Sequence, residues 1–483
     1  MRYVIGIDVG TTATKALLVS EDGRVMAQAS QRYGLSTPSP GFVEQSPQDL
    51  WQACVSTVRA VLSDNRSRDV VAIGLSTQGG TIVGLDEDRV PTGMAITWLD
   101  KRGEGEVERL VEEKGASFFV ERTGMRAPGL VIPRLLWVKA HQPQRFAGTR
   151  HWAFVNDYIV SRLTGHLVAD PSNVCLCGLY NLWTNSYDPE MLALGGLSEE
   201  MLAPIAESGT VAGTLTPAAA QELGLSPSTV VAAAGHDQYC AALGAGIVSP
   251  GSMLLSCGTA WVLLSPTDAP TVDSTGDTLP GRHLLPGLYG VLGVISNGSV
   301  VWDWFSRILF GDAVDYEEIE RTLGSIPPGC EGLRCWPGFL RADTPLPVGP
   351  GGALLGLSLS LSRGHILRSV MEGLALEARR RAEHMAQLGV GARTLSMIGG
   401  AAQSRLWPQI VSDVLNVRVT VPENKEAAAL GAAVLGLKAA GLIPHLREGC
   451  RRAQGKERRI SPDPSSRHTY DVLYEKHKAI VGQ

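Results

Sequence analysis

The sequence predicts an α/β protein that contains two domains of related architecture, and three observations carry this prediction. The chain has 483 residues, which favours roughly two or three domains over a single core. Patterns typical of strands are followed by patterns typical of helices in both halves, as in α/β proteins. A strand, a Gly-Thr turn and a second strand occur near the start and again near residue 258, which indicates a weak internal repeat of one domain plan.

In the first half, alternating apolar residues and turn signals indicate the strands. These strands are expected over residues 3–7, 16–19, 25–28, 70–76 and 230–234. A helix is expected over 47–62, because Ser46 can cap it and Pro47 suits its first position. The segment 107–223 is expected to be mostly helical.

The second half repeats the alternation and ends in a clear α/β unit. Its strands are expected over 252–256, 261–264, 395–398 and 417–421, and its helices over 365–388, 405–415 and 427–440. We therefore predict an N-terminal domain over 1–246 and a C-terminal domain over 247–445. The tail, 446–483, carries no motif that indicates a function.

Composition indicates a packed, soluble protein and excludes several classes of partner. Hydrophobic residues make up 44% of the chain, charged residues 19%, and the formal charge is −5. These values do not suit a nucleic-acid-binding or membrane-bound protein. The eight cysteines are scattered without a CxxC pair, so free thiols in a reducing cytoplasm are expected rather than zinc or disulfides.

The first candidate site is the run 6–15, where a turn rich in Gly and Thr joins two strands. The backbone amides of such a turn, at Gly10, Thr11 and Thr12, can hold phosphate oxygens, and Lys15 lies three residues further on. Asp8 can hold Mg²⁺ directly or through water. An ordinary hairpin with a Thr-rich turn explains the same run equally well.

The second candidate site is Asp237, which lies where a strand of small residues meets an Ala-rich helix. Capping the helix is the commonest role of Asp at such a junction. The alternative role is that of a general base, because phosphoryl transfer needs a carboxylate that orients a hydroxyl and accepts its proton. Asp8 and Asp237 are then the two carboxylates expected beside Mg²⁺.

Two glycine-rich turns in the second half complete the candidate nucleotide site. Gly258-Thr259 mirrors the first turn and could hold an outer phosphate, although such a dipeptide is usually only a turn. Gly399, Gly400, Ala401 and Gln403 follow a strand, and a turn of such small residues leaves room for a flat ring or a ribose. Neither turn has the GxGxxG spacing of a dinucleotide site.

In their order along the chain, these motifs resemble those of the FGGY carbohydrate kinases of the actin/Hsp70/sugar-kinase superfamily. The resemblance covers residues 2–442 and is strongest over 6–18, 154–165, 235–246 and 398–407. The run 133–138 is similar to the family's first signature, with Arg134 where Lys is usual. The resemblance implies two ribonuclease-H-like, actin-like domains with ATP in the cleft between them.

The resemblance also implies roles for individual residues. It places Asp8 near Mg²⁺ and Thr11, Thr12, Gly258 and Thr259 near phosphates, while Asp237 becomes the catalytic base. It places Gly399, Gly400 and Ala401 beside the adenosine. The expected sugar contacts are Gln78, Gly79, Gly80, Thr81, Trp98, Asp100, Asp237 and Gln238.

The acceptor is expected to be a small sugar or polyol, and a ketopentose such as xylulose is the first hypothesis. Xylulokinases usually carry Met-His-Gly after the residue that matches Gln78, where this chain has Gly79-Gly80-Thr81. A kinase of glycerol, erythritol or another polyol is therefore the alternative. A non-enzymatic actin- or Hsp70-like ATP-binding protein and a dinucleotide oxidoreductase are alternatives of other classes, and a homodimer is a possible assembly.

Overall fold

The structure is a computed structural model that describes residues 1–62, 69–312, 315–339, 345–346 and 349–481. It divides into two compact units, each made of three segments of the chain. The first unit comprises Met1–Val248, Thr267–Gly290 and Glu426–Gly455. The second comprises Ser249–Pro266, Val291–Lys425 and Lys456–Gln483. Both units mix strands with helices, so the α/β prediction is confirmed.

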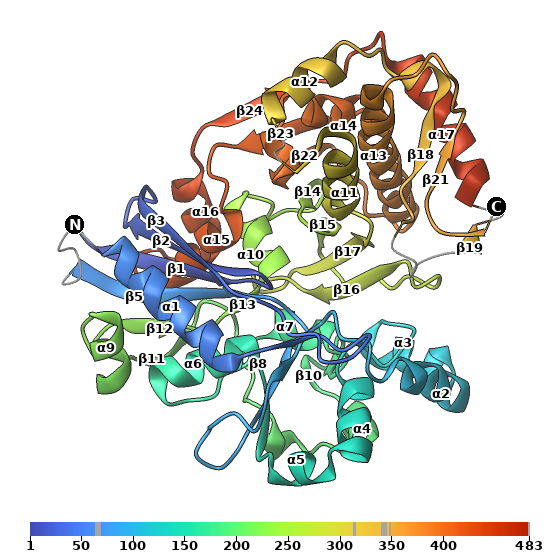
Figure 1. Ribbon diagram of the computed structural model, residues 1–483. Helices are drawn as coiled ribbons and strands as arrows, with labels where there is room; N and C mark the ends of the chain where they lie inside the picture. The colour runs from blue at the N-terminus through green and yellow to red at the C-terminus, as the bar shows by residue number, and fades with distance from the viewer. Residues whose placement is uncertain (63–68, 313–314, 340–344, 347–348, 482–483) are drawn as a thin grey trace. The chain divides into compact units, whose positions relative to one another are not determined.

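The elements of the first unit are the following, and Figure 1 labels many of them. They are β1 (Tyr3–Val9), β2 (Ala13–Ser20), β3 (Val25–Arg32), β4 (Glu44–Gln45), α1 (Pro47–Val61), β5 (Val70–Thr77), β6 (Ile82–Leu85), β7 (Ala95–Ile96), α2 (Glu104–Lys114), α3 (Ala116–Thr123), α4 (Ile132–His141), α5 (Pro143–Gly148), β8 (His151–Phe154), α6 (Val155–Thr164), α7 (Pro171–Leu176), β9 (Tyr180–Asn181), β10 (Ser186–Tyr187), α8 (Pro189–Gly195), η2 (Glu199–Met201), β11 (Val211–Thr214), α9 (Pro217–Leu223), β12 (Val230–Ala232), β13 (Gly235–His236), α10 (Asp237–Gly244), β16 (Thr278–Arg282), α15 (Ala427–Ala439) and α16 (Leu446–Ala453).

The elements that lie wholly or mostly in the second unit follow. They are β14 (Ser252–Cys257), β15 (Trp261–Thr267), β17 (Tyr289–Ile295), α11 (Ser299–Phe310), α12 (Tyr316–Gly324), η3 (Cys330–Gly332), β18 (Arg334–Trp336), β19 (Pro345–Leu346), β20 (Gly349–Pro350), β21 (Ala353–Leu355), α13 (Arg363–Gln387), β22 (Thr394–Gly399), η4 (Ala401–Gln403), α14 (Trp407–Leu415), β23 (Arg418–Pro422), β24 (Glu457–Ile460) and α17 (Arg467–Val481).

The main sheet of the first unit has the strand order β11-β12-β5-β1-β2-β3, and β13 also pairs with β5. The central strand β1 is antiparallel to β2 and parallel to β5. The two faces of β1 carry different kinds of residue. Ile5 and Ile7 join the apolar core that includes Leu50 and Trp51 of α1, and the residue between them, Gly6, lies on the opposite face.

Helix α15 packs closely on that opposite face. A Cβ atom on Gly6 would lie 2.0 Å from the carbonyl oxygen of Ala429, and one on Gly74 would lie 1.8 Å from that of Ala432. Only glycine permits such an approach of helix and strand backbones. Since side chains alternate along a strand, Asp8 and Ser76, two residues after these glycines, lie on the same face as α15.

The main sheet of the second unit follows the same plan. The strands of this sheet that lie wholly or mostly in the second unit run in the order β17-β15-β14-β22-β23-β24. The central strand β14 is antiparallel to β15 and parallel to β22. The next strands are β23, parallel to β22, and β24, antiparallel to β23. In the first unit β5, β12 and β11 succeed one another with the same directions. The internal repeat thus corresponds to two sheets of one topology.

Most of the helices expected from the sequence are observed within one or two residues. Helix α1 begins at Pro47, and the Ser46 hydroxyl caps it by accepting from the Asp49 amide at 3.2 Å. The prediction for 107–223 is confirmed in part, because four short strands, β8 to β11, interrupt the helices there. Within the described part of the chain, no helix is long and apolar enough to cross a membrane.

The tail forms structure in both units. Helix α16 lies in the first unit, whereas β24 and α17 lie in the second. Helix α17 is fixed to α13 by His477, whose Nε2 atom lies 2.6 Å from Glu377 Oε1. The continuous domain limits predicted from the sequence, 1–246 and 247–445, stay a prediction, while the compact units themselves are discontinuous.

Candidate functional site

In the first unit, the carboxyl ends of three neighbouring strands bring two acids to one edge of the sheet. Asp8 of β1 is in register with Ser76 of β5, and His236 of β13 is in register with Thr77. Asp237, the first residue of α10, follows directly. The Ser76 hydroxyl donates to Asp8 Oδ1 at 2.7 Å. The carboxyl ends of parallel strands are where α/β proteins commonly bind ligands.

Burial raises the pKa of both acids, and Asp237 adds to the shift at Asp8. The pKa of Asp8 rises to about 7, because the group is buried and because Asp237 is close by, although the Ser76 hydrogen bond and Lys15 oppose the shift. Burial likewise raises the pKa of Asp237 to about 6, against hydrogen bonding from Gln238. Lys15 lies opposite Asp8 on β2 and pairs with Glu426 at 2.6 Å. Such perturbed carboxyl groups are typical of functional sites.

This acid pair fits a Mg²⁺ ion. A divalent cation would relieve the repulsion that raises the pKa of Asp8. Within the described residues, no cluster of three or more acidic, His or Cys side chains could hold a metal. A Mg²⁺ ion beside Asp8 and Asp237 would need water and phosphate oxygens as its other ligands, and Mg²⁺ usually binds in that way.

The Gly-Thr loop between β1 and β2 is held by side chains from outside the loop. The Gly10 carbonyl accepts from the Tyr33 hydroxyl at 2.5 Å and from Gln78 Nε2 at 3.3 Å. Gln45 Nε2 donates to the Thr11 carbonyl. Next to it, the carbonyl of the exposed Thr12 accepts from the Tyr33 amide at 3.2 Å. These bonds fix the conformation of the loop.

Several residues predicted to contact the sugar form one polar network with this loop. The Thr11 hydroxyl donates to Gln78 Oε1 at 3.2 Å and accepts from Trp98 Nε1 at 2.9 Å. The Thr81 hydroxyl donates to Gln78 Oε1 at 3.1 Å and accepts from the Trp98 amide at 3.2 Å. The structure thus joins the predicted phosphate contact Thr11 to three predicted sugar contacts. Gly80, which links them, has a left-handed φ of 70°.

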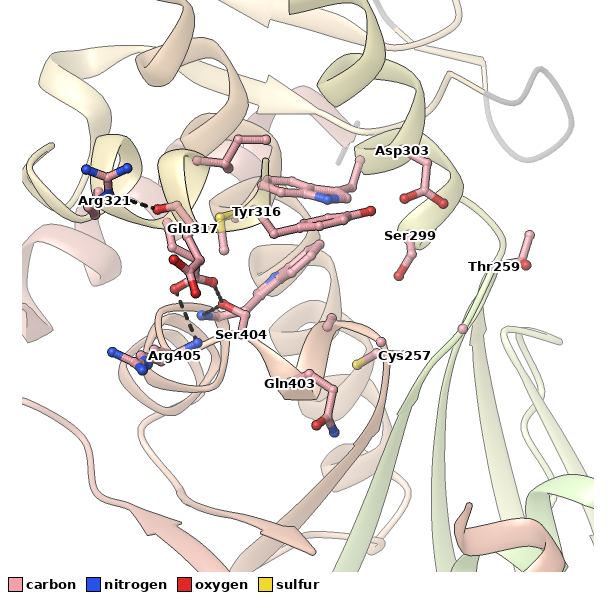
Figure 2. Close-up of a pocket in the computed structure, with 18 residues that line it drawn as sticks. Cys257, Thr259, Ser299, Asp303, Tyr316, Glu317, Arg321, Gln403, Ser404 and Arg405 are labelled. Atoms are coloured by element: carbon pink, nitrogen blue, oxygen red, sulfur yellow. Dashed lines mark hydrogen bonds between the residues drawn. The ribbon is translucent and has the colours of Figure 1, made fainter. Parts of the chain in front are cut away.

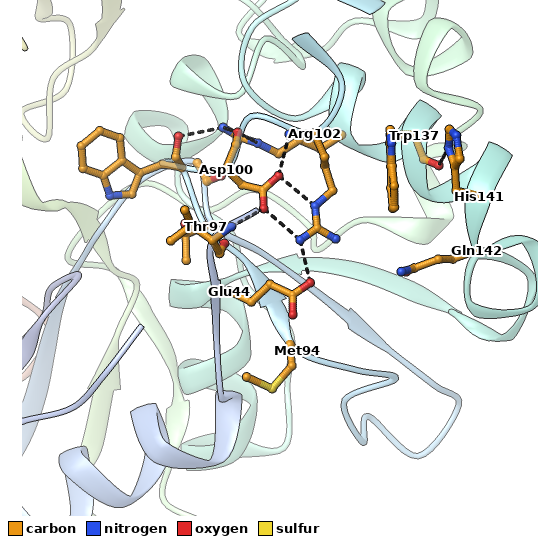
Figure 3. Close-up of polar contacts among 12 residues, drawn as sticks. Glu44, Met94, Thr97, Asp100, Arg102, Trp137, His141 and Gln142 are labelled. Atoms are coloured by element: carbon orange, nitrogen blue, oxygen red, sulfur yellow. Dashed lines mark hydrogen bonds and ion pairs between the residues drawn. The ribbon is translucent and has the colours of Figure 1, made fainter. Parts of the chain in front are cut away.

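Asp100, also predicted to contact the sugar, is occupied by other partners. Figure 3 shows its carboxylate facing Arg102, which lies between Asp100 and Glu44. Arg102 Nε donates to Asp100 Oδ1 at 2.8 Å, and the Val43 amide donates to Oδ2 at 2.7 Å. The side chains of Asp100 and Arg102 are fully buried. Asp100 therefore holds the segment that carries Trp98 in place.

Arg134 supports the same segment from α4. Its guanidinium donates to the carbonyl groups of Gly80, Trp98 and Asp100 at distances between 2.7 and 3.2 Å. From the sequence, Arg134 stood out only because it replaces a usual Lys. The planar fork of arginine reaches several carbonyl groups at once, which a lysine ammonium group does less well.

Unsatisfied polar atoms mark the space beside Asp237. In the part of the chain that the structure describes, Thr77 Oγ1, His236 Nδ1 and Gln238 Oε1 are buried and have no hydrogen-bond partner. Such atoms are costly unless a ligand or water completes them. Of the remaining predicted sugar contacts, Gly79 packs directly against the ring of His236.

In the second unit, the equivalent loop borders a cavity of about 780 Å³. This volume is within the usual range for small-molecule sites. Five of the six residues predicted on this side line it: Gly258, Thr259, Gly400, Ala401 and Gln403. Gly399, the sixth, pairs in register with Cys257 and has a left-handed φ of 91°, so β22 approaches β14 closely.

The cavity also contains residues that the sequence did not single out. Figure 2 shows Tyr316 from α12 and Ser299 from α11, which line the same cavity as Gln403. Trp302 and Trp407 line it too, with ring centroids 4.9 Å apart. Glu320 accepts from the Ser404 hydroxyl and from the Arg405 amide, which fixes the turn after η4. Aromatic walls beside bare backbone suit a flat heterocycle.

Two such α/β units, with a carboxylate pair beside a Gly-Thr loop in one and a cavity of nucleoside size in the other, offer groups that a phosphotransferase could use. Comparison with known proteins makes the class specific. The models of the N-terminal and C-terminal domains of the FGGY family of carbohydrate kinases match residues 3–244 and 253–440. The chain belongs to this family, and it is a sugar phosphotransferase for which the family implies ATP as co-substrate.

Individual relatives agree with this assignment. A xylulose kinase from Bacillus subtilis is 31% identical, over 99% of this chain and 97% of its own. A gluconokinase from Bacillus licheniformis is 27% identical, over 91% and 88%. The crystal structure of a ligand-bound xylulose kinase from Lactobacillus acidophilus superposes with a TM-score of 0.90 at 25% identity, covering 99% of this chain and 98% of that one.

These comparisons decide between the classes that the sequence left open. The structural neighbours are FGGY sugar kinases, so the actin-like, two-domain α/β fold is confirmed. The resemblance to the FGGY family is confirmed as well. The non-enzymatic actin- or Hsp70-like alternative and the dinucleotide oxidoreductase alternative are wrong.

Proposed function

We propose that the enzyme transfers the γ-phosphate of MgATP to a hydroxyl group of a ketopentose such as xylulose, with Asp237 as general base. The observation that carries the proposal is the carboxyl pair Asp8 and Asp237 at one strand edge, beside the Gly-Thr loop of residues 10–12. Several curated relatives named xylulose kinase favour a ketopentose.

In the proposed reaction, Asp237 accepts the proton of the acceptor hydroxyl while that oxygen bonds to the γ-phosphorus. The bond from the γ-phosphorus to the oxygen bridging to the β-phosphate breaks, and ADP leaves with the bonding electrons. Asp237 has a pKa raised to about 6 by burial, so its carboxylate is ionised at neutral pH and basic enough to accept a proton. When bound, Mg²⁺ supplies positive charge that offsets the charge on the phosphates.

Each unit has its own proposed contribution. In the first unit, Gly10, Thr11 and Thr12 hold phosphate oxygens near Lys15, while Gln78, Gly79, Gly80, Thr81, Trp98 and Gln238 surround the acceptor and Asp100 supports them. In the second unit, Gly258 and Thr259 hold phosphate, and Gly399, Gly400, Ala401 and Gln403 bind the adenosine. The domain limits 1–246 and 247–445 belong to the same proposal.

A coupled ADP-release assay across ketopentoses, ketohexoses, aldonates, glycerol and erythritol tests the acceptor. The proposal expects a ketopentose to give the highest kcat/KM. Aldonates are the second candidate, because gluconokinases match 91% of this chain. Clear preference for glycerol or erythritol would overturn the ketopentose assignment and favour the polyol alternative.

We further propose that the enzyme works in the cytoplasm, because all eight cysteines are buried free thiols, as a reducing compartment favours. A homodimer stays part of the proposal. Light scattering of the purified protein measures its mass directly, and a mass of one chain would contradict the dimer.

A further inference from the structure

The imidazole of His236 occupies the space that a side chain at position 79 would need. His236 is 6% exposed. A Cβ atom on Gly79 would lie 2.5 Å from His236 Cδ2 and 2.7 Å from Nε2. Real Cβ atoms do not approach ring atoms so closely, so the ring can adopt this position only because residue 79 is glycine.

The ring nitrogens of His236 have distinct roles. Nε2 lies 3.1 Å from Asp237 Oδ1, whereas Nδ1 has no partner among the residues that the structure describes. A neutral imidazole carries one N–H group, on either ring nitrogen. With the proton on Nε2, that nitrogen lies 3.1 Å from an acceptor, Oδ1 of Asp237.

The backbone of His236 is anchored independently of its ring. The His236 amide donates to the Ser172 hydroxyl at 2.9 Å. That hydroxyl in turn donates to the buried carboxylate of Asp170, which caps α7. The Asn156 side chain donates to the other oxygen of Asp170 at 2.9 Å. This chain of hydrogen bonds fixes the end of β13. The backbone that carries the His236 imidazole is therefore held in place beside Asp237.

We infer that His236 is a positioning residue for the proposed base: Nε2–H holds Oδ1 of Asp237, leaving Oδ2 to accept the proton of the acceptor hydroxyl. Gly79 admits the ring that makes this contact. The inference rests on the proposed function. A group that orients a catalytic carboxylate acts on the transfer step, and misplacement of such a group lowers turnover more than it weakens binding.

The first experiment compares three substitutions at position 236, with D-xylulose as the acceptor, or gluconate if the acceptor assay favours aldonates. His236→Ala is expected to lower kcat about 10- to 100-fold with KM for MgATP within about twofold. His236→Gln can place an amide N–H near the Nε2 position and should recover at least half of the lost activity on a logarithmic scale. His236→Asn is the matched control, because its amide is too short to reach Oδ1.

A second experiment tests the coupling to Gly79. Gly79→Ala in the parent enzyme should lower kcat about tenfold, because the new methyl group displaces the ring. In the His236→Ala background the same change should cost less than about twofold. Melting temperatures of all variants show whether each one is folded, and the two amide variants give the comparison if His236→Ala is not.

Equal loss in His236→Gln and His236→Asn, or the same cost of Gly79→Ala in both backgrounds, would overturn the inference. Asp237→Asn, measured in parallel, separates it from the proposed function. If Asp237→Asn keeps its turnover, the general-base proposal fails. If Asp237→Asn is inactive while His236→Ala keeps the parent kcat, only the positioning role fails.

Discussion

The two Gly-Thr loops follow the same strand in the same sheet plan, yet they are held in different ways. In the first unit, the loop carbonyls accept from the side chains of Tyr33, Gln45 and Gln78. In the second unit, the carbonyls of Gly258 and Thr259 accept from the backbone amides of Ser299 and Val300, at the start of α11. The first loop therefore depends on side chains of its polar site, while the second depends on a helix end.

The acids are distributed just as unequally. Asp8 is paired in register with Ser76, whereas the matching position in the second unit, Ser256, is paired with Ile398. The first unit thus places a carboxylate where the second has a hydroxyl beside apolar chain. Under the proposed function, one backbone plan serves two tasks, with proton and metal chemistry in the first unit and ring binding in the second.

The strongest test of this division is Asp237→Asn. Loss of the proposed base should lower kcat about 1000-fold, because positioned acid–base groups contribute about 10²- to 10⁴-fold, and KM for MgATP should change little. ADP release measured under steady-state conditions checks both values. Asp49→Asn, an acid in the first turn of α1, is the control, and equal turnover in the two variants would refute the role of Asp237.

The matched pair Asp8→Asn and Ser256→Ala tests whether the two loops differ chemically. Asp8→Asn should lower kcat about 100-fold at fixed Mg²⁺ concentration, because removing one electrostatic group from a phosphoryl-transfer site commonly costs about that much. Ser256→Ala should stay within about twofold. Similar losses of kcat in both variants would show that the two loops contribute equally to phosphate transfer, contrary to the comparison.

Gly400→Leu tests the second unit alone. Nothing lies within 4 Å of a Cβ atom at Gly400, and this residue has helical φ and ψ, so a side chain can be added without strain. It should enter the cavity and raise KM for MgATP about tenfold, while KM for the sugar stays within about twofold. Gly324→Ala at the end of α12, where the same open space exists, is the control. An equal rise in both KM values would argue against separate binding tasks.

The smallest expected effect is on stability, and it depends on pH. The pKa of Asp8 is raised in the folded protein to about 7 from 3.8, so the folded state binds this proton more tightly than the unfolded chain. The stability from this group is complete below pH 3.8 and is lost as pH rises through 7.

In EDTA at pH 8, Asp8→Asn should therefore unfold at a higher temperature than the parent, with a gain of about 2 kcal/mol. The gain should shrink as pH falls toward 4, where both proteins should unfold alike. Calorimetric scans at pH 4, 6 and 8 measure this difference. A variant that is less stable at pH 8 would contradict the raised pKa of Asp8, which burial and then Asp237 produce.

Local sequence rules were sufficient for much of the fold and for part of the site. Strand alternation, the cap at Ser46 and the two Gly-Thr turns each depend on residues a few positions apart, and the structure has these elements where the sequence predicts them. Five of the six residues predicted for the nucleotide site in the second unit also line the cavity, since a glycine-rich turn after a buried strand leaves open space.

Tertiary structure alone decided the contacts between distant segments. The aromatic rings of Trp302, Tyr316 and Trp407 meet around one cavity, and no periodicity in the sequence links them. The sequence predicts Asp100 as a sugar contact, yet its carboxylate oxygens accept hydrogen bonds from Arg102 and from the Val43 amide.

The sequence by itself determined the α/β class, the two Gly-Thr loops and the candidates Asp8 and Asp237. Only the register of β1, β5 and β13 decided that these acids share one edge of the sheet, close enough for Asp237 to raise the pKa of Asp8 in addition to burial. The physical reason is distance along the chain. Propensities and caps act within a turn or two, whereas Asp8 and Asp237 are brought together by the pairing and packing of the whole unit.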